Sequence, residues 1–265
     1  MRERPVRVRV ACVKLTVVGC SGSFPGPDSA ASCYLVEAPY EGRTYRLVLD
    51  LGSGAFGALQ RYVDPYEVDA VGFSHLHADH CMDLCAYYVA RKYHPDGPKP
   101  QIPVYGPFGT ADRMAAAYGL PAEPGMREEF DFRAWLGGDG CELGPFTVKP
   151  VPVAHPVEAY AIRLEHQGKV LVYSGDTGPT DVLLELAQGA DLFLCEATYL
   201  VGQPQAPNVH LTAWKAAEYA ARARVGRLVL THIPPWNDRT QTLAQALPAY
   251  DGPTDLASPG SVFEL

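Results

Sequence analysis

The sequence lacks a long apolar run, and no stretch approaches the roughly 18 consecutive apolar residues that a membrane span requires. It also lacks an excess of positive charge, because 22 Lys and Arg residues stand against 30 Asp and Glu residues, for a net charge of −8. A protein that holds long nucleic acids on a broad basic face is therefore not expected. We find no internal repeat and no linker-like stretch, so we expect one domain over residues 1–265.

Paired cysteines and a secretory leader are lacking as well. The seven cysteines are odd in number and scattered, and the arginine-rich start is followed by no apolar block of signal-peptide type. Cys81 and Cys85 lie four residues apart, but no second pair completes a cysteine zinc site, and we interpret both as small buried hydrophobic residues. These features predict a cytoplasmic protein with reduced thiols.

Short apolar strands alternate with helices along the chain. The patterns of β-branched and apolar residues, helical spacing and Gly/Pro turns indicate the following elements. We expect strands at 6–10, 14–20, 32–38, 45–52, 68–74, 146–155, 159–166, 169–176, 190–197, 227–231 and 261–265, helices at 80–94, 108–119, 180–188 and 212–225, and a loop at 21–31. Residues 96–145 are otherwise not assigned. Two halves, each with strands before helices, predict an α/β fold: a four-layer αββα sandwich of two mixed sheets packed face to face, with helices outside.

The chain has eight histidines, and three of them fall within residues 75–80, in the stretch "HLHADH". Further histidines and aspartates follow later strands. The candidate ligands are His75, His77, Asp79, His80, His155, Asp176 and His232. Nitrogen and carboxylate ligands at the ends of separate strands suit zinc or a similar divalent ion, and loops at strand ends are where sheet proteins build their sites.

The spacing H-x-H-x-D-H can serve two ions from one short loop. We expect residues 75, 77 and 79 to point to one side of an extended turn, while His80 begins a helix and points to the other side. Two ions about 3.5–4 Å apart could share such a loop.

The order H-x-H-x-D-H, lone His, Asp, final His resembles the metallo-β-lactamase superfamily across nearly the whole chain. The resemblance implies one ion on His75, His77 and His155, a second on Asp79, His80 and His232, and Asp176 between them. It also implies that Asp50, in "VLDLGSG", braces the ligand loop from behind. The implied cofactors are two divalent ions, with zinc expected first and manganese or iron also accepted.

Two further residues indicate which kind of hydrolysis the site would catalyse. Glu196 in "FLCEATY" and His210 in "NVHLTAWKAAEYA" resemble the Glu and His of the ribonuclease Z and phosphodiesterase branch of that superfamily. There the histidine protonates the departing oxygen and the glutamate orients it, which suits a poor leaving group. Asp79, Glu196 and His210 are thus the expected catalytic residues.

The tRNA-cleaving members of that branch usually carry a long Gly/Pro-rich arm between the lone His and the bridging Asp. Here Asp176 follows His155 by only 21 positions, which leaves no room for an arm. The stretches "GCSGSFPGPDSAASCYLV", "SHLHADHCMDL", "YSGDTG" and "LTHIPPW" resemble bacterial atypical class II cyclic-nucleotide phosphodiesterases.

That resemblance implies hydrolysis of 3′,5′-cyclic AMP, and of cyclic GMP too, to the 5′-monophosphate by a hydroxide shared between the ions. It also implies a homodimer. The loop 21–31 and Tyr87, Tyr88 and Trp236 are candidates to flank the base. A ribonuclease Z-like tRNA 3′-processing nuclease, an acyl hydrolase of the lactonase or β-lactamase type, and a silent metal-dependent binding module remain the alternatives.

Overall fold

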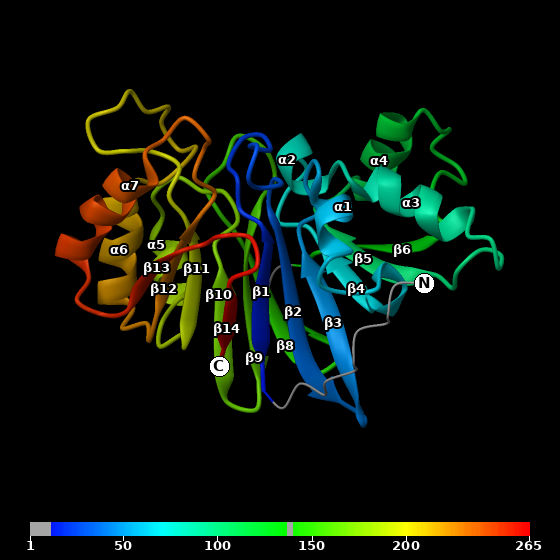
Figure 1. Cartoon of the computed structure of the whole chain (residues 1–265), viewed down its shortest axis with the longest axis horizontal. Coiled ribbons are helices and arrows are strands. Elements are labelled where there is room, and N and C mark those ends of the chain that lie inside the picture. The colour runs from blue at the N-terminus through cyan, green and yellow to red at the C-terminus, as the bar shows by residue number, and fades with distance from the viewer. Residues whose placement is uncertain (1–11, 137–139) are drawn as a thin grey trace.

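The computed structural model describes residues 12–136 and 140–265, which form two seven-stranded sheets with helices on their outer faces (Figure 1). The predicted strand at 6–10 lies outside the described residues. The first sheet has the order β14 (Val262–Glu264), β1 (Lys14–Gly19), β2 (Cys33–Tyr40), β3 (Arg43–Leu49), β4 (Ala70–Gly72), β5 (Ile102–Gly106), β6 (Phe130–Ala134). The second has the order β13 (Thr254–Leu256), β12 (Leu228–Thr231), β11 (Leu192–Glu196), β10 (Lys169–Tyr173), β9 (Tyr160–His166), β8 (Phe146–Pro152), β7 (Cys141–Leu143).

The helices form the two outer layers, and the predicted αββα sandwich is confirmed. They are α1 (Ala55–Leu59), α2 (Ala78–Cys81), α3 (Leu84–Lys92), α4 (Thr110–Tyr118), α5 (Asp181–Leu186), α6 (Ala213–Arg222) and α7 (Arg239–Ala246), with 3₁₀ turns at Pro65–Glu67 and Leu247–Ala249. In Figure 1, α1, α3 and α4 lie beside the first sheet, and α5, α6 and α7 beside the second. None of the helices in the described part of the chain is long and apolar enough to cross a membrane.

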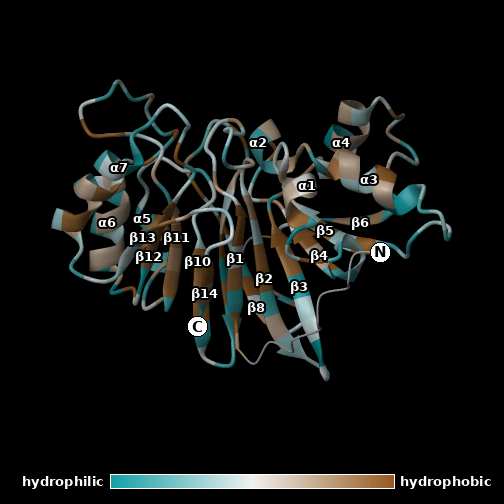
Figure 2. Ribbon diagram, in the orientation of Figure 1, coloured by the Kyte–Doolittle hydropathy of each residue, from teal (hydrophilic) through white to brown (hydrophobic). Residues whose placement is uncertain are grey.

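Alternation along the strands explains why the sheets are covered on both faces. In β10, Leu171 and Tyr173 enter the core between the sheets, whereas Val170 and Val172 enter the core beneath α5 and α6. Successive side chains of a strand point to opposite faces, so an almost wholly apolar strand implies two apolar neighbours. Figure 2 shows the hydrophobic colour concentrated along the strands.

Helix α6 shows how sequence signals become packing. Its buried residues Ala213, Ala216, Ala217 and Ala220 recur at helical spacing and let the helix approach β11 and β12 closely. The expected N-cap is present, because Thr212 Oγ1 accepts a hydrogen bond from Lys215 N at 3.1 Å. The helix therefore begins immediately after the segment that carries His210.

The prediction of a single helix at 80–94 is wrong, because the structure has two helices there. The chain forms α2 and α3 with a break at Met82 and Asp83, where Asp83 Oδ2 accepts a hydrogen bond from Phe56 N at 2.9 Å. The break separates the ligand-bearing turn from α3. Strands β5, β6, β7 and β13 and helices α1 and α7 were not predicted, since they are short, between three and eight residues, and give a weak periodic signal.

Candidate metal centre

The candidate ligands all follow the carboxyl ends of strands on one edge of the sandwich. His75 comes soon after β4, His155 after β8, Asp176 after β10 and His232 directly after β12. Strands β10, β11 and β12 are mutually parallel, and β8 runs the same way because both β8 and β10 pair antiparallel with β9. The fold thus brings all seven side chains to a single place.

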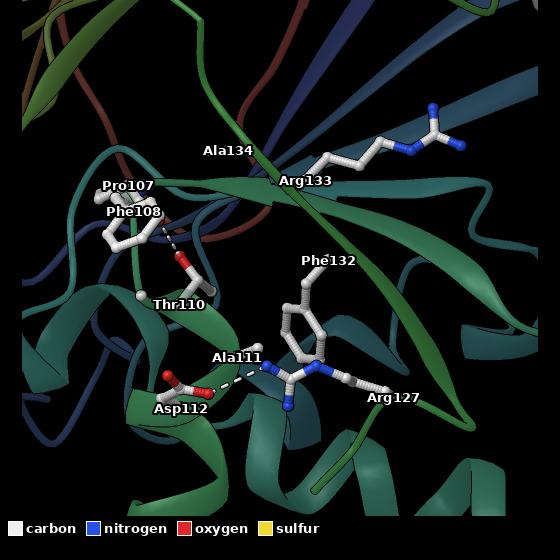
Figure 3. A pocket seen from close by; sticks show the side chains of 10 residues that line it. Pro107, Phe108, Thr110, Ala111, Asp112, Arg127, Phe132, Arg133 and Ala134 are labelled. Atoms are coloured by element: carbon white, nitrogen blue, oxygen red, sulfur yellow. Dashed lines mark hydrogen bonds and ion pairs between the residues drawn. The ribbon is translucent and has the colours of Figure 1, made fainter. Parts of the chain in front are cut away.

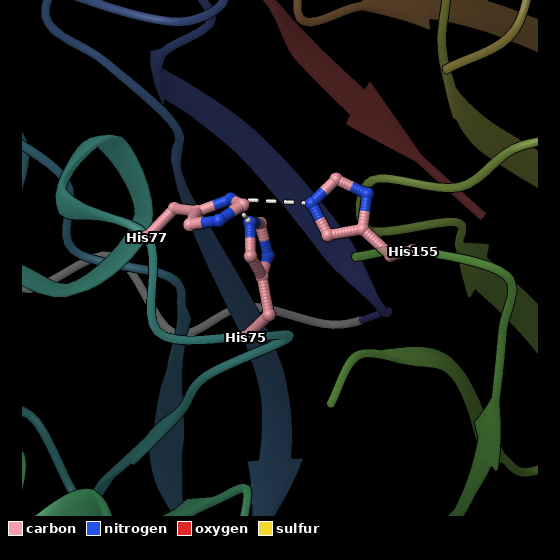
Figure 4. Close-up of side chains that lie close together, drawn as sticks. All are labelled: His75, His77 and His155. Atoms are coloured by element: carbon pink, nitrogen blue, oxygen red, sulfur yellow. Dashed lines mark hydrogen bonds between the residues drawn. The ribbon is translucent and has the colours of Figure 1, made fainter. Parts of the chain in front are cut away.

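A first group, called here the three-histidine group, consists of His75, His77 and His155 (Figure 4). His77 Nδ1 lies 3.0 Å from His75 Nε2 and 3.1 Å from His155 Nε2. Figure 4 shows the three rings converging from two sides of the site. Nitrogens bound to one tetrahedral zinc at about 2.0–2.1 Å stand about 3.3–3.4 Å apart, so these spacings fit one ion.

The hydrogen bonding and burial of this group favour neutral rings. His155 Nδ1 donates to Val209 O at 3.0 Å, so its Nε2 carries no proton in the neutral ring. Burial lowers the pKa of His75, His77 and His155. Neutral imidazole is the form that binds metals, so three neutral rings whose nitrogens lie about 3 Å apart favour a cation there.

A second group, called here the four-residue group, consists of Asp79, His80, Asp176 and His232, all of them buried except for part of Asp79. His232 Nε2 lies 3.1 Å from Asp79 Oδ2 and 3.3 Å from Asp176 Oδ2. His80 Nε2 lies 3.5 Å and 3.3 Å from the same two oxygens. Asp176 Oδ2 is also 3.7 Å from His75 Nε2, so this oxygen faces both groups.

Two buried atoms of the four-residue group without a hydrogen bond fit a cation site. Within the described chain, His80 Nε2 and Asp176 Oδ1 are buried and make no hydrogen bond. Buried polar atoms are ordinarily satisfied, and leaving one unpaired costs about 1–3 kcal/mol. Burial alone would raise the pKa of Asp79 and Asp176, but the neighbouring His232 and His80 rings lower both. Carboxylates that stay ionised beside unpaired imidazole nitrogen are ligands suited to a divalent ion.

Asp50 braces the four-residue group through a fully buried carboxylate. Its Oδ2 accepts hydrogen bonds from His80 Nδ1 at 2.7 Å and from Tyr173 Oη at 2.7 Å. Ser74 adds its backbone N–H to Oδ1 at 2.7 Å and its hydroxyl to Oδ2 at 2.8 Å. With Nδ1–H of His80 held in this way, Nε2 is left to face the ions, as metal-binding histidines require.

The backbone near Asp50 is shaped for this contact. Asp50 has a φ of 56°, in the left-handed region that only a few non-glycine residues tolerate. Two residues later, a Cβ on Gly52 would come within 1.9 Å of Asp79 O. Only glycine allows the turn after β3 to pack so closely against the ligand loop.

Glu196 and His210 lie beside the two groups. His210 Nδ1 donates to Glu196 Oε1 at 3.0 Å, and lies 3.9 Å from Asp176 Oδ2. Glu196 is fully buried at the end of β11, and its Oε1 also accepts Thr177 N at 2.8 Å. Burial alone would lower the pKa of His210, but the Glu196 carboxylate raises it to about 9. The expected pair is therefore assembled, with His210 Nδ1 engaged by its partner.

Thr198 connects this pair to a candidate ligand, a role that sequence analysis did not assign. Its hydroxyl donates to Glu196 Oε2 at 2.8 Å and lies 2.8 Å from His232 Nδ1, which can donate to it. The Thr198 hydroxyl thus holds the His232 ring with Nε2 toward Asp79 and Asp176. The only sequence signal was its place in the "EAT" block after β11.

Two expectations about side-chain directions are wrong. Asp79 does not share a side with residues 75 and 77, because it lies in α2, where successive residues rotate by about 100° rather than alternate. It joins His80 instead. Tyr87 and Tyr88 do not flank the site, because both are buried under α3 in the outer core of the first sheet.

A separate hollow of about 220 Å³ lies between α4 and β6 (Figure 3). Its two arginines are paired with acidic groups: Arg127 contacts Asp112 at 3.0 Å, and Arg133 contacts Asp131. Figure 3 shows Arg127 directed at Asp112 and Arg133 extending away from the hollow. We therefore place the candidate chemistry at the ligand groups and not here.

Comparisons with known proteins agree with this geometry. The family model of the β-lactamase superfamily domain matches residues 45–233. The uncharacterized protein ML1173 of Mycobacterium leprae is 46% identical over 97% of this chain and 90% of its own length. Ribonuclease Z of Myxococcus xanthus is 26% identical over 97% of this chain and 99% of its own length.

A solved structure extends the likeness to three dimensions. The metallo-β-lactamase fold protein YhfI of Bacillus subtilis superposes with a TM-score of 0.85 at 27% identity, covering 96% of this chain and 100% of that one. Its sequence is named a probable metallo-hydrolase. Fold, ligand geometry and sequence matches converge, and the chain belongs to the metallo-β-lactamase superfamily as a metallo-hydrolase of the ribonuclease Z and phosphodiesterase branch.

Proposed function

We propose that this protein hydrolyses 3′,5′-cyclic nucleotides, cyclic AMP foremost, to 5′-monophosphates. The observation that carries the proposal is the His210–Glu196 pair beside two candidate ion sites. Rupture of the ribose 3′-oxygen bond to phosphorus leaves a poorly stabilised alkoxide, which needs a proton as it departs. A positioned imidazole supplies that need, whereas acyl hydrolysis of an activated ring does not demand it.

The ligands are proposed as predicted: His75, His77 and His155 for one ion, Asp79, His80 and His232 for the other, with Asp176 shared. Bound there, two divalent ions would supply a nucleophilic water at neutral pH and offset the charge that develops on the phosphoryl oxygens. The histidine-rich set suits zinc, and manganese or iron are also compatible with it.

The chain's own groups would divide the remaining work. His210 would donate its Nε2 proton to the leaving oxygen, while Glu196 accepts from Nδ1 and fixes the ring. Thr177 N and the Thr198 hydroxyl hold the Glu196 carboxylate in turn. Because Glu196 is fully buried, it acts on the ring and does not reach the substrate itself.

A tRNA 3′-processing nuclease is the alternative that the name of the Myxococcus relative favours. Against it, the segment between His155 and Asp176 forms only the β9–β10 hairpin, closed by Gln167 and Gly168. No extended arm for tRNA leaves the sandwich at this point. The net charge of −8 also disfavours a long polyanion.

One assay series separates these functions. The purified protein, loaded with zinc or manganese, is given cyclic AMP, bis(p-nitrophenyl) phosphate, precursor tRNA and a β-lactam. We expect turnover of cyclic AMP and of the chromogenic diester. Cleavage of precursor tRNA without turnover of cyclic AMP would reject the proposal in favour of the nuclease.

The proton-donor role has its own variant. His210→Ala is expected to keep its metal content and to lose about 10²- to 10⁴-fold in kcat on cyclic AMP. The loss should be much smaller on bis(p-nitrophenyl) phosphate, whose leaving group needs no proton. His94→Ala is the matched control, because His94 lies at the end of α3 and packs on Tyr66. Equal losses on both substrates would contradict the role.

A further inference from the structure

Two aromatic rings stand exposed on loops that adjoin the candidate metal centre. Phe24 comes from the loop 21–31 and Trp236 from the segment after His232, and their ring centroids lie 5.1 Å apart at an interplanar angle of 42°. The Phe24 residue is 43% exposed and Trp236 is 64% exposed. Such surface usually favours a partner, because burying aromatic area is favourable and the rings offer flat faces.

The loop that carries Phe24 is tied directly to a candidate ligand. Ser23 N–H lies 3.3 Å from His232 Nε2, and Gly22 N donates to Ile233 O at 3.2 Å. A Cβ at position 22 would come within 2.3 Å of His232 O, so the approach requires glycine. Phe24 therefore directly follows Ser23, whose backbone N–H contacts His232 of the four-residue group.

The segment that carries Trp236 is also held in place. Pro234 and Pro235 restrict its backbone, and Asn237 N donates to Pro234 O at 2.9 Å. Asn237 Nδ2 donates to Thr198 O at 2.7 Å, which ties the segment to the strand end that holds Glu196. A backbone held in this way loses little conformational freedom on binding, so a ligand would gain more of the contact energy.

We propose that Phe24 and Trp236 form an aromatic platform for the nucleobase of the substrate, an inference that rests on the proposed phosphodiesterase function. A cyclic nucleotide joins a flat heterocycle to a phosphodiester by one ribose. Its two ends match the two features that adjoin here, an aromatic surface and a candidate two-ion centre. Base stacking on aromatic side chains is tolerant of base identity, because every base has a π-face.

The platform has a consequence for selectivity. Neighbouring polar groups are engaged within the protein: Asn237 Oδ1 accepts from Gln203 at 3.2 Å, and Arg239 donates to Ala257 O at 2.6 Å. Recognition would then use the face of the base more than its edge. Cyclic AMP and cyclic GMP are accordingly expected to have KM values within about tenfold of each other.

The test compares Trp236→Ala, Trp236→Phe and Phe24→Ala in the metal-loaded protein. For cyclic AMP, Trp236→Ala should raise KM by about 5- to 150-fold, the range that stacking energies give, with kcat little changed. Trp236→Phe should retain most of the affinity. The base-free analogue, methyl riboside 3′,5′-cyclic phosphate, should show no change of KM. Tyr93→Ala is the control. Tyr93 lies at the C-terminal end of α3, is 65% exposed and packs against another aromatic ring, that of Tyr88.

Calorimetric titration with AMP separates this inference from the proposed function. Weaker AMP binding in Trp236→Ala, in a protein that fails to hydrolyse cyclic AMP, would uphold the platform and overturn the function. Normal hydrolysis with an unchanged KM in both alanine variants would overturn the platform and uphold the function. A rise of KM that is equal for cyclic AMP and the base-free analogue would also overturn it, since the effect would then not involve the base.

Discussion

The two groups of candidate ligands differ in charge and in exposure. The three-histidine group offers three neutral imidazoles, two of them only partly buried, whereas the four-residue group is buried and brings two carboxylates. Asp176 Oδ2 faces both groups, so an ion in the first group would have one carboxylate beside it and an ion in the second would have two. Coulombic attraction at short range in a buried site is strong, so we expect the four-residue group to bind its ion more tightly. The more exposed ion would remain the more electrophilic one.

Removing the shared carboxylate should have the largest effect. Asp176→Ala takes away the oxygen that faces both groups, and loss of even an indirect partner of a ligand costs about 10- to 100-fold. We expect binding of both ions to weaken by more than about 100-fold, with activity falling in step. Elemental analysis after gel filtration measures the ions per chain. Glu185→Ala, on the exposed side of α5, is the control, and two retained ions in Asp176→Ala would contradict the shared role.

Removing one histidine from each group tests the difference between them directly. His155→Ala should leave one tightly held ion, and His232→Ala should leave one ion that a chelator removes quickly. In the unaltered protein, stepwise titration with dipicolinate should release the ion of the three-histidine group first. Colorimetric measurement of released zinc follows both phases. Release of the two ions in the opposite order would reverse the comparison.

A smaller effect, limited to one group, is expected from Asp50→Asn. The amide cannot accept as strongly from His80 Nδ1, Ser74 and Tyr173. The affinity of the four-residue group for its ion should fall by about 10- to 100-fold, and the affinity of the three-histidine group should not change. Competition with a fluorescent zinc chelator gives both affinities. Tyr173→Phe, which removes only one donor to the same carboxylate, should change them much less, and equal weakening of both ions in Asp50→Asn would show a general loss of structure.

The smallest effect should come from Thr198→Val. Valine keeps the volume but removes the hydroxyl between Glu196 and His232. We expect less than about a tenfold loss in affinity for one ion and a fall of about 1 kcal/mol in the free energy of unfolding. Thr198→Ser should restore both values, as measured by chelator competition and by urea denaturation. Failure of serine to restore them would point to packing by the methyl group instead.

Much of the site could be predicted because its residues occupy strand ends. Apolar runs such as 169–173 mark strands by composition alone, and the polar residue that follows each run was the signal for His155, Asp176 and His232. Parallel strands place such residues on one edge, which is why positions far apart in sequence could be assigned to one centre. The double coverage of each sheet followed from the same apolar runs.

The directions and connections of side chains could not be predicted in the same way. Asp79 was misplaced because the chain turns helical one residue before it, which changes the period from two to 3.6. Thr198 and Tyr173 were missed because their roles depend on partners 34 and 123 residues away, which no local pattern records. Tyr87 and Tyr88 could not be told from binding-site aromatics by sequence, and the structure shows that both pack in the core.

The course of the chain between the sheets limits how the sandwich can move. Strands β6 and β7 are edge strands at one end of the two sheets, and β13 and β14 are edge strands at the other end. The chain therefore passes from one sheet to the other at both edges, and opening the sandwich like a clamshell would expose the apolar core that the two sheets share. Admission of substrate and escape of product should consequently depend on small loop displacements along the rim, with the sandwich itself acting as a fixed frame.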